Sequence, residues 1–176
     1  ELAGIIPKKE CCQRAELSGL LNSGGTFTWD DSQNEMVWEL STENAATARK
    51  VFKLAKALLA VPVEVSILNK RQLKKNKVFI VRARQERDEM FLMQELGLFN
   101  GQGRRVERVP ESLVHRRCCK RCYLRGAFLA RGSVNKPEGE YHLEITCPSL
   151  VTAQDVAKLL EKLGIAARVS ERKSGI

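Results

Sequence analysis

The 176-residue sequence lacks several features that would place it in common protein classes. No apolar run approaches the roughly 20 residues that a membrane-spanning helix needs. The amino-terminal segment has no basic stretch followed by an apolar one, as a secretory signal peptide would have. There are only two histidines, no Walker loop, no complete GxGxxG after a strand and no nucleophile-elbow serine. These absences argue against a membrane protein, a secreted protein and the familiar nucleotide-binding or hydrolytic enzymes.

The composition is that of a folded protein with a basic excess. Hydrophobic residues make up 43% of the chain, and 30 Lys and Arg residues against 21 Asp and Glu residues give a net charge of +9. This excess favours an anionic partner, with nucleic acid first and a membrane surface second. A basic protein without a specific partner is the alternative. The six cysteines are interpreted as cytosolic thiols, because the chain is long enough to bury a core without disulfides.

The chain repeats itself. Residues 11–27 and 118–134 share six identical residues at an offset of 107, including both members of a Cys-Cys pair and two glycines. Residues 47–58 and 152–163 share six more at an offset of 105. Two similarities in the same order and at nearly the same offset indicate one supersecondary unit used twice.

Periodicity and turn residues predict the elements of each repeat. The first repeat, 1–99, is expected to contain helices and strands in the order αββαββα. Its predicted elements are helices 11–23, 44–60 and 88–96 and strands 26–29, 36–40, 63–68 and 78–83. An Arg-rich linker, 100–117, leads to a second repeat, 118–176, that lacks the last pieces. Its predicted elements are helices 118–130 and 149–163 and strands 133–135, 141–146 and 167–171.

The first helix of each repeat carries a stripe of small residues. Glycine inside a helix costs roughly 1 kcal/mol relative to alanine, so its presence at both equivalent positions needs a packing reason. We expect the two helices to pack closely about a pseudo-two-fold axis. The residues of this stripe are Cys12, Ala15, Gly19, Ser23, Cys119, Cys122, Gly126 and Ala130.

Cys119 and Cys122 form a CxxC pair, which is typical of half a zinc site. A complete site needs four ligands, and the sequence offers neither a second CxxC pair nor a suitable pair of histidines. Buried packing thiols are therefore favoured over metal ligands. No metal and no cofactor is expected.

Residues 17–25 and 124–132 resemble two divergent LAGLIDADG helices, the signature of two-repeat homing endonucleases. The resemblance implies an α+β fold, a pseudo-two-fold duplicated αββαββα arrangement with a saddle of antiparallel sheets. Residues 11–21, 118–134 and 141–145 are similar to the WhiA family of sporulation and cell-division transcription factors. In that family a helix-turn-helix DNA-binding domain follows, so we expect a longer protein of which this is the amino-terminal part.

The resemblance also implies a loss of catalysis. In the nucleases, the residue before the last glycine of each motif is an acid, and the two acids bind the divalent metals for phosphodiester cleavage. The matching positions here are Gly24 and Arg131, which cannot supply carboxylate oxygens. The alternatives are an active nuclease or RNA maturase that uses Asp30 or Asp31, and a protein-interaction scaffold without nucleic-acid contact.

Basic residues identify where DNA phosphates could be contacted. Alternation along strand 78–83 places Arg82, and Arg84 just beyond the strand, on the open face of the sheet. The resemblance implies that this is the face that the nucleases use on DNA. In the second repeat, Glu144 would repel DNA from the same face. A solvated basic rim is the alternative. The candidates are Lys70, Arg71, Lys74, Lys75, Lys77, Arg82, Arg84, Arg104, Arg105 and Arg131.

The expected partners follow from these hypotheses. DNA would be bound mainly by the carboxy-terminal domain and weakly by this one, and other transcription or cell-division proteins are further partners. We expect a cytoplasmic, nucleoid-associated monomer with internal pseudo-symmetry and no membrane contact.

Overall fold

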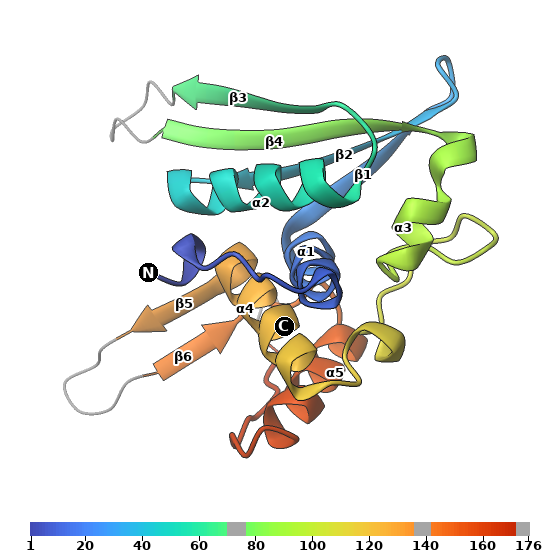
Figure 1. The fold of residues 1–176 in the computed structure, drawn as a ribbon. Coiled ribbons are helices and arrows are strands. Elements are labelled where there is room, and N and C mark those ends of the chain that lie inside the picture. Colours follow the sequence, from blue (N-terminus) through green and yellow to red (C-terminus); the bar gives the residue numbers. More distant parts are fainter. Residues whose placement is uncertain (70–76, 136–141, 172–176) are drawn as a thin grey trace.

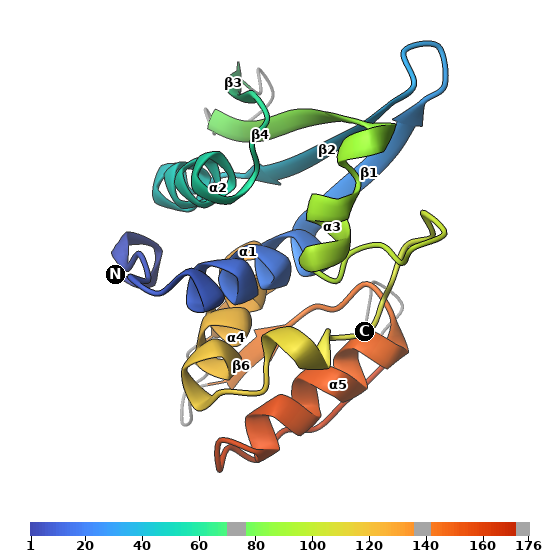
Figure 2. The same ribbon diagram turned by 45° about the vertical axis from the view of Figure 1, so that its right-hand side comes forward.

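The fold is described from a computed structural model, for residues 1–69, 77–135 and 142–171. Two helices, α1 and α4, lie side by side at the centre (Figures 1 and 2). A four-stranded sheet with helix α2 lies on one side of this pair, and a two-stranded sheet with helix α5 lies on the other. The expected α+β class is confirmed, since each repeat sets helices against an antiparallel sheet.

The first repeat forms an antiparallel sheet in the order β1-β2-β4-β3. The register aligns β1 with β2 from Gly25 opposite Leu40 to Asp30 opposite Glu35. All four strands and the first two helices are within a few residues of their predicted bounds. The elements are α1 Glu10–Gly24, β1 Gly25–Asp30, β2 Glu35–Thr42, α2 Ala45–Leu58, β3 Val63–Asn69 and β4 Lys77–Glu86.

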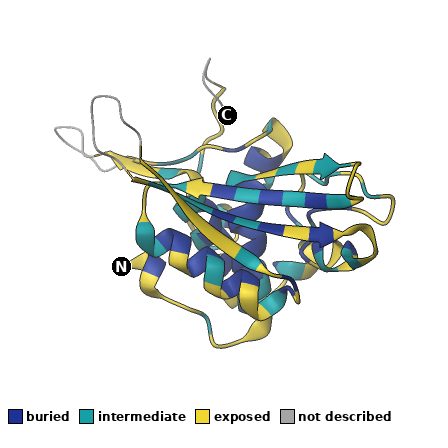
Figure 3. Ribbon diagram, turned by 90° about the horizontal axis from the view of Figure 1, so that it is seen from above, coloured by how far each residue is buried: buried dark blue, intermediate teal, exposed yellow. Residues whose placement is uncertain are grey.

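Helix α2 begins where the sequence supplies a cap. The side chain of Asn44 accepts hydrogen bonds from the backbone N–H groups of Ala46 and Thr47, which would otherwise lack partners. Its apolar stripe faces the sheet, so Val51 and Leu54 are buried with Trp38. Burying each such large side chain contributes about 1.5–3 kcal/mol. Figure 3 shows buried positions alternating with less buried ones along the two central strands, β2 and β4.

The predicted helix over 88–96 is broken into two short pieces, a 3-10 helix Arg87–Glu89 and α3 Phe91–Glu95. Pairing of β4 with β2 continues to Glu86, and the N–H of Arg87 donates to the carbonyl of Asn34. Strand β4 therefore runs three residues past its predicted end at Ala83 and stops just before the predicted helix, whose residues are helical except for a break at Met90. Gly97, with φ of 65°, ends the segment.

The segment predicted as a linker, 100–117, packs against both repeats. Val109 and Val114 are buried in the core of the second repeat. Arg108 forms an ion pair with Asp155 of α5, with 3.1 Å between Nη2 and Oδ1, and the N–H of Val109 donates to the same carboxylate. A 3-10 helix, Glu111–Leu113, follows, and α4 already begins at Arg117. Residues 100–117 thus fix the second repeat in place.

The second repeat is smaller in its described part. Its two strands pair antiparallel, with Val134 opposite Leu143. The strand predicted over 167–171 is wrong, because these residues have no ladder partner and form no regular structure. The elements are α4 Arg117–Arg131, β5 Gly132–Asn135, β6 His142–Ile145 and α5 Leu150–Glu161. None of the helices built from described residues combines the length and apolarity that a membrane crossing requires.

Candidate nucleic-acid interface and helix seam

The seam between α1 and α4 depends on two glycines related by the repeat. A Cβ atom on Gly19 would lie 2.2 Å from the carbonyl oxygen of Tyr123, and one on Gly126 would lie 2.3 Å from that of Glu16. The two contacts are pseudo-symmetric, since Tyr123 follows Glu16 by the same offset of 107. Each helix backbone therefore lies directly against the other, and no side chain fits between them.

The other small residues of the predicted stripe line the same seam. Sγ of Cys12 lies 4.0 Å from Sγ of Cys119 near the beginnings of the helices. A Cβ on Gly24 would lie 2.9 Å from that of Ala130 near their ends. The helices therefore run parallel, with both amino termini at one end. Of the remaining stripe residues, Ala15, Ser23 and Cys122 are buried.

A buried charge network beside the seam was not predicted from the sequence. Glu16 and Lys50 are fully buried and form an ion pair, with 2.5 Å between Oε1 and Nζ. Arg125 donates to both carboxylate oxygens of Glu16, from Nε at 2.8 Å and from Nη2 at 2.5 Å. Burial lowers the pKa of Lys50, and the hydrogen bond to Glu16 raises the pKa of Arg125. The network links α1, α2 and α4.

Lys50 also holds the amino-terminal segment. Its ammonium donates to the backbone carbonyls of Leu2 at 3.0 Å and Ile5 at 2.6 Å. All three of its protons thus have acceptors, which is what a buried ammonium requires. No pattern in the sequence marks Lys50, because it lies on a helix among other basic residues.

Arg105, a candidate for DNA contact, uses its guanidinium for contacts within the protein. Its guanidinium donates to the side chain of Asn22 at 2.6 Å and to the carbonyl of Leu98 at 2.7 Å. It lies over the ring of Phe27, 4.7 Å from the centroid. Asn22 in turn donates to the hydroxyl of buried Tyr123 at 2.8 Å. Arg105 therefore anchors the segment after the first repeat to the helix pair.

The ends of α1 and α4 carry no carboxylate. Gly24 and Arg131 are the last residues of the two helices, at the positions where the nucleases have their metal-binding acids. Asp30 is five residues along β1 from Gly25, a distance of about 17 Å in a strand. Its Oδ1 instead accepts hydrogen bonds from Ser32 in the β1–β2 turn, which lower the pKa of Asp30. Asp30 therefore lies too far along the strand to replace an acid at the helix ends.

The open face of the first sheet departs from the sequence expectation. Arg82 and Arg84 do project from it, because Val81 and Ala83 are buried on the other face. The strand register also brings acids to the same face: Arg82 pairs with Glu39 of β2, and Nη1 of Arg84 lies 3.6 Å from Oε2 of Glu35. On the described strands, the open face therefore carries acids beside both of its arginines. This face carries the two guanidinium groups of Arg82 and Arg84 and also five carboxylates, those of Asp30, Glu35, Glu39, Glu64 and Glu86.

The other basic candidates are scattered. Lys77, Arg104 and Arg131 are exposed, and each lies on a different element or turn. These candidates therefore come from separate parts of the chain. The remaining candidates lie outside the described residues: Lys70, Arg71, Lys74 and Lys75.

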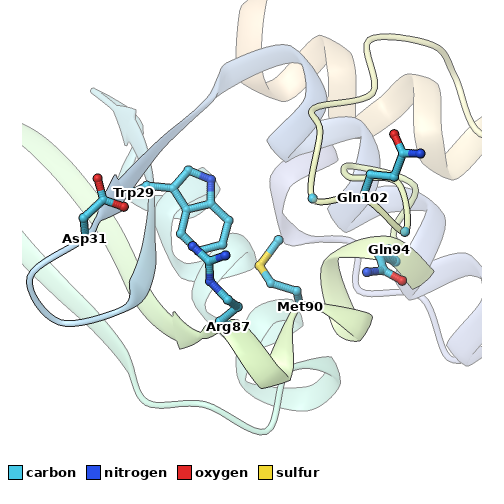
Figure 4. Close-up of a pocket in the computed structure, with 8 residues that line it drawn as sticks. Trp29, Asp31, Arg87, Met90, Gln94 and Gln102 are labelled. Carbon is cyan, nitrogen blue, oxygen red and sulfur yellow. The ribbon is translucent and has the colours of Figure 1, made fainter.

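A shallow pocket of about 550 Å³ lies between the β1–β2 turn, α3 and the turn at 101–103. Figure 4 shows Arg87 beside the ring of Trp29, with its guanidinium 5.1 Å from the ring centroid. Met90 and Asp31 also line the pocket, with Asp31 at the end nearest the β1–β2 turn. The lining offers no pair of nucleophile and base, so this pocket has no catalytic constellation.

Comparison with known proteins agrees with this geometry. The family description "WhiA N-terminal LAGLIDADG-like domain" matches residues 10–99, and "WhiA LAGLIDADG-like domain" matches residues 120–176. The chain belongs to the WhiA family. The resemblance inferred from the sequence is therefore confirmed.

A WhiA relative from Heliobacterium modesticaldum, named "Probable cell division protein WhiA", is 41% identical over 98% of this chain and 54% of its own length. The chain thus spans about half the length of the curated relatives it matches. The solved N-terminal LAGLIDADG domain of DUF199/WhiA has a TM-score of 0.68 at 23% identity, over 99% of this chain and 77% of that one.

The homing endonuclease I-WcaI, solved bound to its DNA recognition sequence, has a TM-score of 0.56 at 12% identity, over 98% of this chain and 82% of that one. At such identities the two structural matches show the fold alone. They confirm the predicted LAGLIDADG homing-endonuclease-like fold.

Proposed function

We propose that this chain is a non-catalytic LAGLIDADG-like domain of a DNA-binding transcription regulator, which acts in cell division and, in sporulating species, in sporulation. One observation carries the proposal: the helix ends that would hold two metal-binding acids carry Gly24 and Arg131. A divalent cation such as Mg²⁺ needs carboxylate oxygens, and a glycine offers none. The guanidinium of Arg131 adds positive charge where a cation would have to bind.

The charges of the open face support weak DNA contact by this domain. A guanidinium that already pairs with a carboxylate must lose that pair before it neutralises a phosphate, and the neighbouring acids repel the DNA backbone. Among the described candidates, Lys77, Arg104 and Arg131 are exposed and are proposed for phosphate contact. We assign most of the DNA affinity to the part of the full-length protein outside this chain, since relatives are nearly twice as long.

Two experiments on the full-length protein test this function. Duplex DNA incubated with Mg²⁺ or Mn²⁺ should remain intact, whereas cleavage that disappears in a purified Asp30→Asn or Asp31→Asn variant would establish a nuclease. DNA binding over a salt series should match that of a variant lacking residues 1–176. A large loss of affinity in that variant would place the main DNA contacts in this chain instead.

The cellular setting is part of the same proposal. A regulator of this kind would work in the cytoplasm in association with the nucleoid, as a monomer with internal pseudo-symmetry. Transcription or cell-division proteins would be its protein partners. Fluorescence imaging of a tagged full-length protein should show overlap with DNA, and exclusion from the nucleoid would contradict this setting.

A further inference from the structure

Four cysteines converge where α1 and α4 begin. Cys11 and Cys12 lie in the first turn of α1, and Cys118 and Cys119 lie at the matching positions of α4. The Sγ atoms of Cys11, Cys12 and Cys119 all lie within 4.8 Å of one another. Sγ of Cys118 lies 3.9 Å from Sγ of Cys119. The cluster exists only because the tight seam brings the two parallel helices together at this end.

The spacing of the sulfur atoms suits a metal ion. In a tetrahedral site with Zn–S bonds of about 2.3 Å, neighbouring sulfurs lie about 3.8 Å apart. The distances from Cys119 to Cys118 and to Cys12 are 3.9 and 4.0 Å. A disulfide would need about 2 Å, and all six cysteines are free thiols here. Cys118 lies outside the group of three sulfurs that lie within 4.8 Å of one another, so its side chain would have to turn toward Cys11 and Cys12 to complete four ligands.

We propose that Cys11, Cys12, Cys118 and Cys119 form a thiolate site for a soft divalent cation, for which Zn²⁺ fits the spacing. Thiolate ligands select such ions over Mg²⁺ and Ca²⁺. Each thiol releases its proton to solvent as its sulfur–metal bond forms, so binding needs no oxidant or reductant. The ion would tie the first repeat to the second at the end of the seam opposite Gly24 and Arg131.

The surroundings favour the charge of such a complex. Four thiolates and one Zn²⁺ carry a net charge of −2, and both helices direct the positive ends of their dipoles at the cluster. The residues that cap the two helices, Lys9 and Arg116, are basic as well.

The cluster differs from the site considered from the sequence alone. That site was the CxxC pair Cys119 and Cys122, with no second pair to complete it. The structure instead groups two vicinal pairs from different helices, and Cys122 interacts with Arg125 at 3.6 Å. Each repeat supplies half of the ligands, so the site depends on the duplication.

Metal titration of the full-length protein tests the proposal. Protein purified under reducing conditions is titrated with zinc chloride against a chromophoric chelator, and with Co²⁺ as a spectroscopic substitute. We expect one ion per chain at this cluster, a thiolate-to-cobalt charge-transfer band, and a sulfur shell at about 2.3 Å in zinc X-ray absorption. Zinc should also raise the melting temperature, because it binds the folded state.

Cysteine variants test whether the metal ion binds at this cluster or at other thiols. Cys118→Ser, at an exposed position, and Cys119→Ser should lose stoichiometric binding, whereas Cys147→Ser, a buried cysteine outside the cluster, should retain it. Circular dichroism checks that each variant is folded. The proposal is overturned if reduced protein binds no zinc stoichiometrically, or if Cys118→Ser and Cys119→Ser bind it as the unchanged protein does. Recovery of a Cys12–Cys119 disulfide from protein purified without reductant would overturn it too.

Discussion

Substitution of Gly19 by alanine tests how closely the two central helices approach. The added methyl would lie 2.2 Å from the carbonyl oxygen of Tyr123, and an ordinary contact begins at 3.4 Å, so the helices must separate by about 1.2 Å. The obstructing atoms belong to backbone, which cannot rotate away. Overpacking of this kind costs about 3 kcal/mol at the upper end of its usual range. Alanine returns about 1 kcal/mol of helix propensity.

We therefore expect Gly19→Ala to lower the free energy of unfolding by about 2 kcal/mol in urea denaturation followed by circular dichroism. Gly101→Ala is the matched control, because a Cβ there meets no atom within 4 Å. It should change stability by less than about 0.5 kcal/mol.

The double variant of Gly19→Ala and Gly126→Ala refines the test. Both methyl groups press on the same seam, so one separation of the helices relieves both. The combined loss should be smaller than the sum of the two single losses. A Gly19→Ala protein as stable as the unchanged one, or more stable, would refute the close approach of the backbones.

Three further predictions concern charge and protonation. Lys50→Met removes one partner of the buried Glu16 carboxylate and should lower the free energy of unfolding by about 3–5 kcal/mol, which a lower melting temperature would show. An unchanged melting temperature would contradict this. Burial raises the pKa of Tyr123 from 10.0 to about 12, so the folded state favours the protonated phenol. Its stabilising contribution is present below pH 10 and is lost as the pH rises to about 12. Denaturation midpoints across this range should fall less steeply in Tyr123→Phe, and equal slopes would argue against the assignment. Replacing Glu39 and Glu35 by Gln frees Arg82 and Arg84 from their ion pairs and should strengthen DNA binding at low salt, with a log–log salt slope steeper by about 0.9 per new phosphate contact. An unchanged slope in gel-shift measurements would show that DNA does not contact this face.

The contact between α1 and α4 was predictable from the sequence because the repeat shows which positions of the two helices are equivalent. Gly19 and Gly126 occupy equivalent places at one offset, and a glycine within a helix is unfavourable unless another backbone needs the space. The two sets of small residues therefore predicted both the helix pair and its symmetry. The strands β1 to β4 were predictable for a similar local reason, since alternation and turn residues mark them.

Long-range partners could not be read in the same way. The pairing of Arg82 with Glu39 depends on the register between β2 and β4, which alternation within one strand does not specify. Alternation correctly assigned Arg82 to the open face but gave no information about the acids beside it. The network of Glu16, Lys50 and Arg125 joins three helices, and no spacing along the chain links those residues.

Over 88–96 the apolar spacing is helical, and helical turns do form, but as a 3-10 helix and a short α-helix separated at Met90 rather than as one helix. The segment 167–171 has a strand-like sequence but forms no strand, because it has no ladder partner.

Binding of Mn²⁺ to the full-length protein in the presence of duplex DNA shows whether the ends of α1 and α4 hold a catalytic metal ion. Paramagnetic resonance counts the bound ions, and a variant with both Gly24→Asp and Arg131→Asp supplies the missing carboxylates as a positive control. We predict no stoichiometric Mn²⁺ at the helix ends of the unchanged protein and a gain in the variant. Stoichiometric binding by the unchanged protein, lost on substitution near Gly24 and accompanied by DNA cleavage, would contradict it.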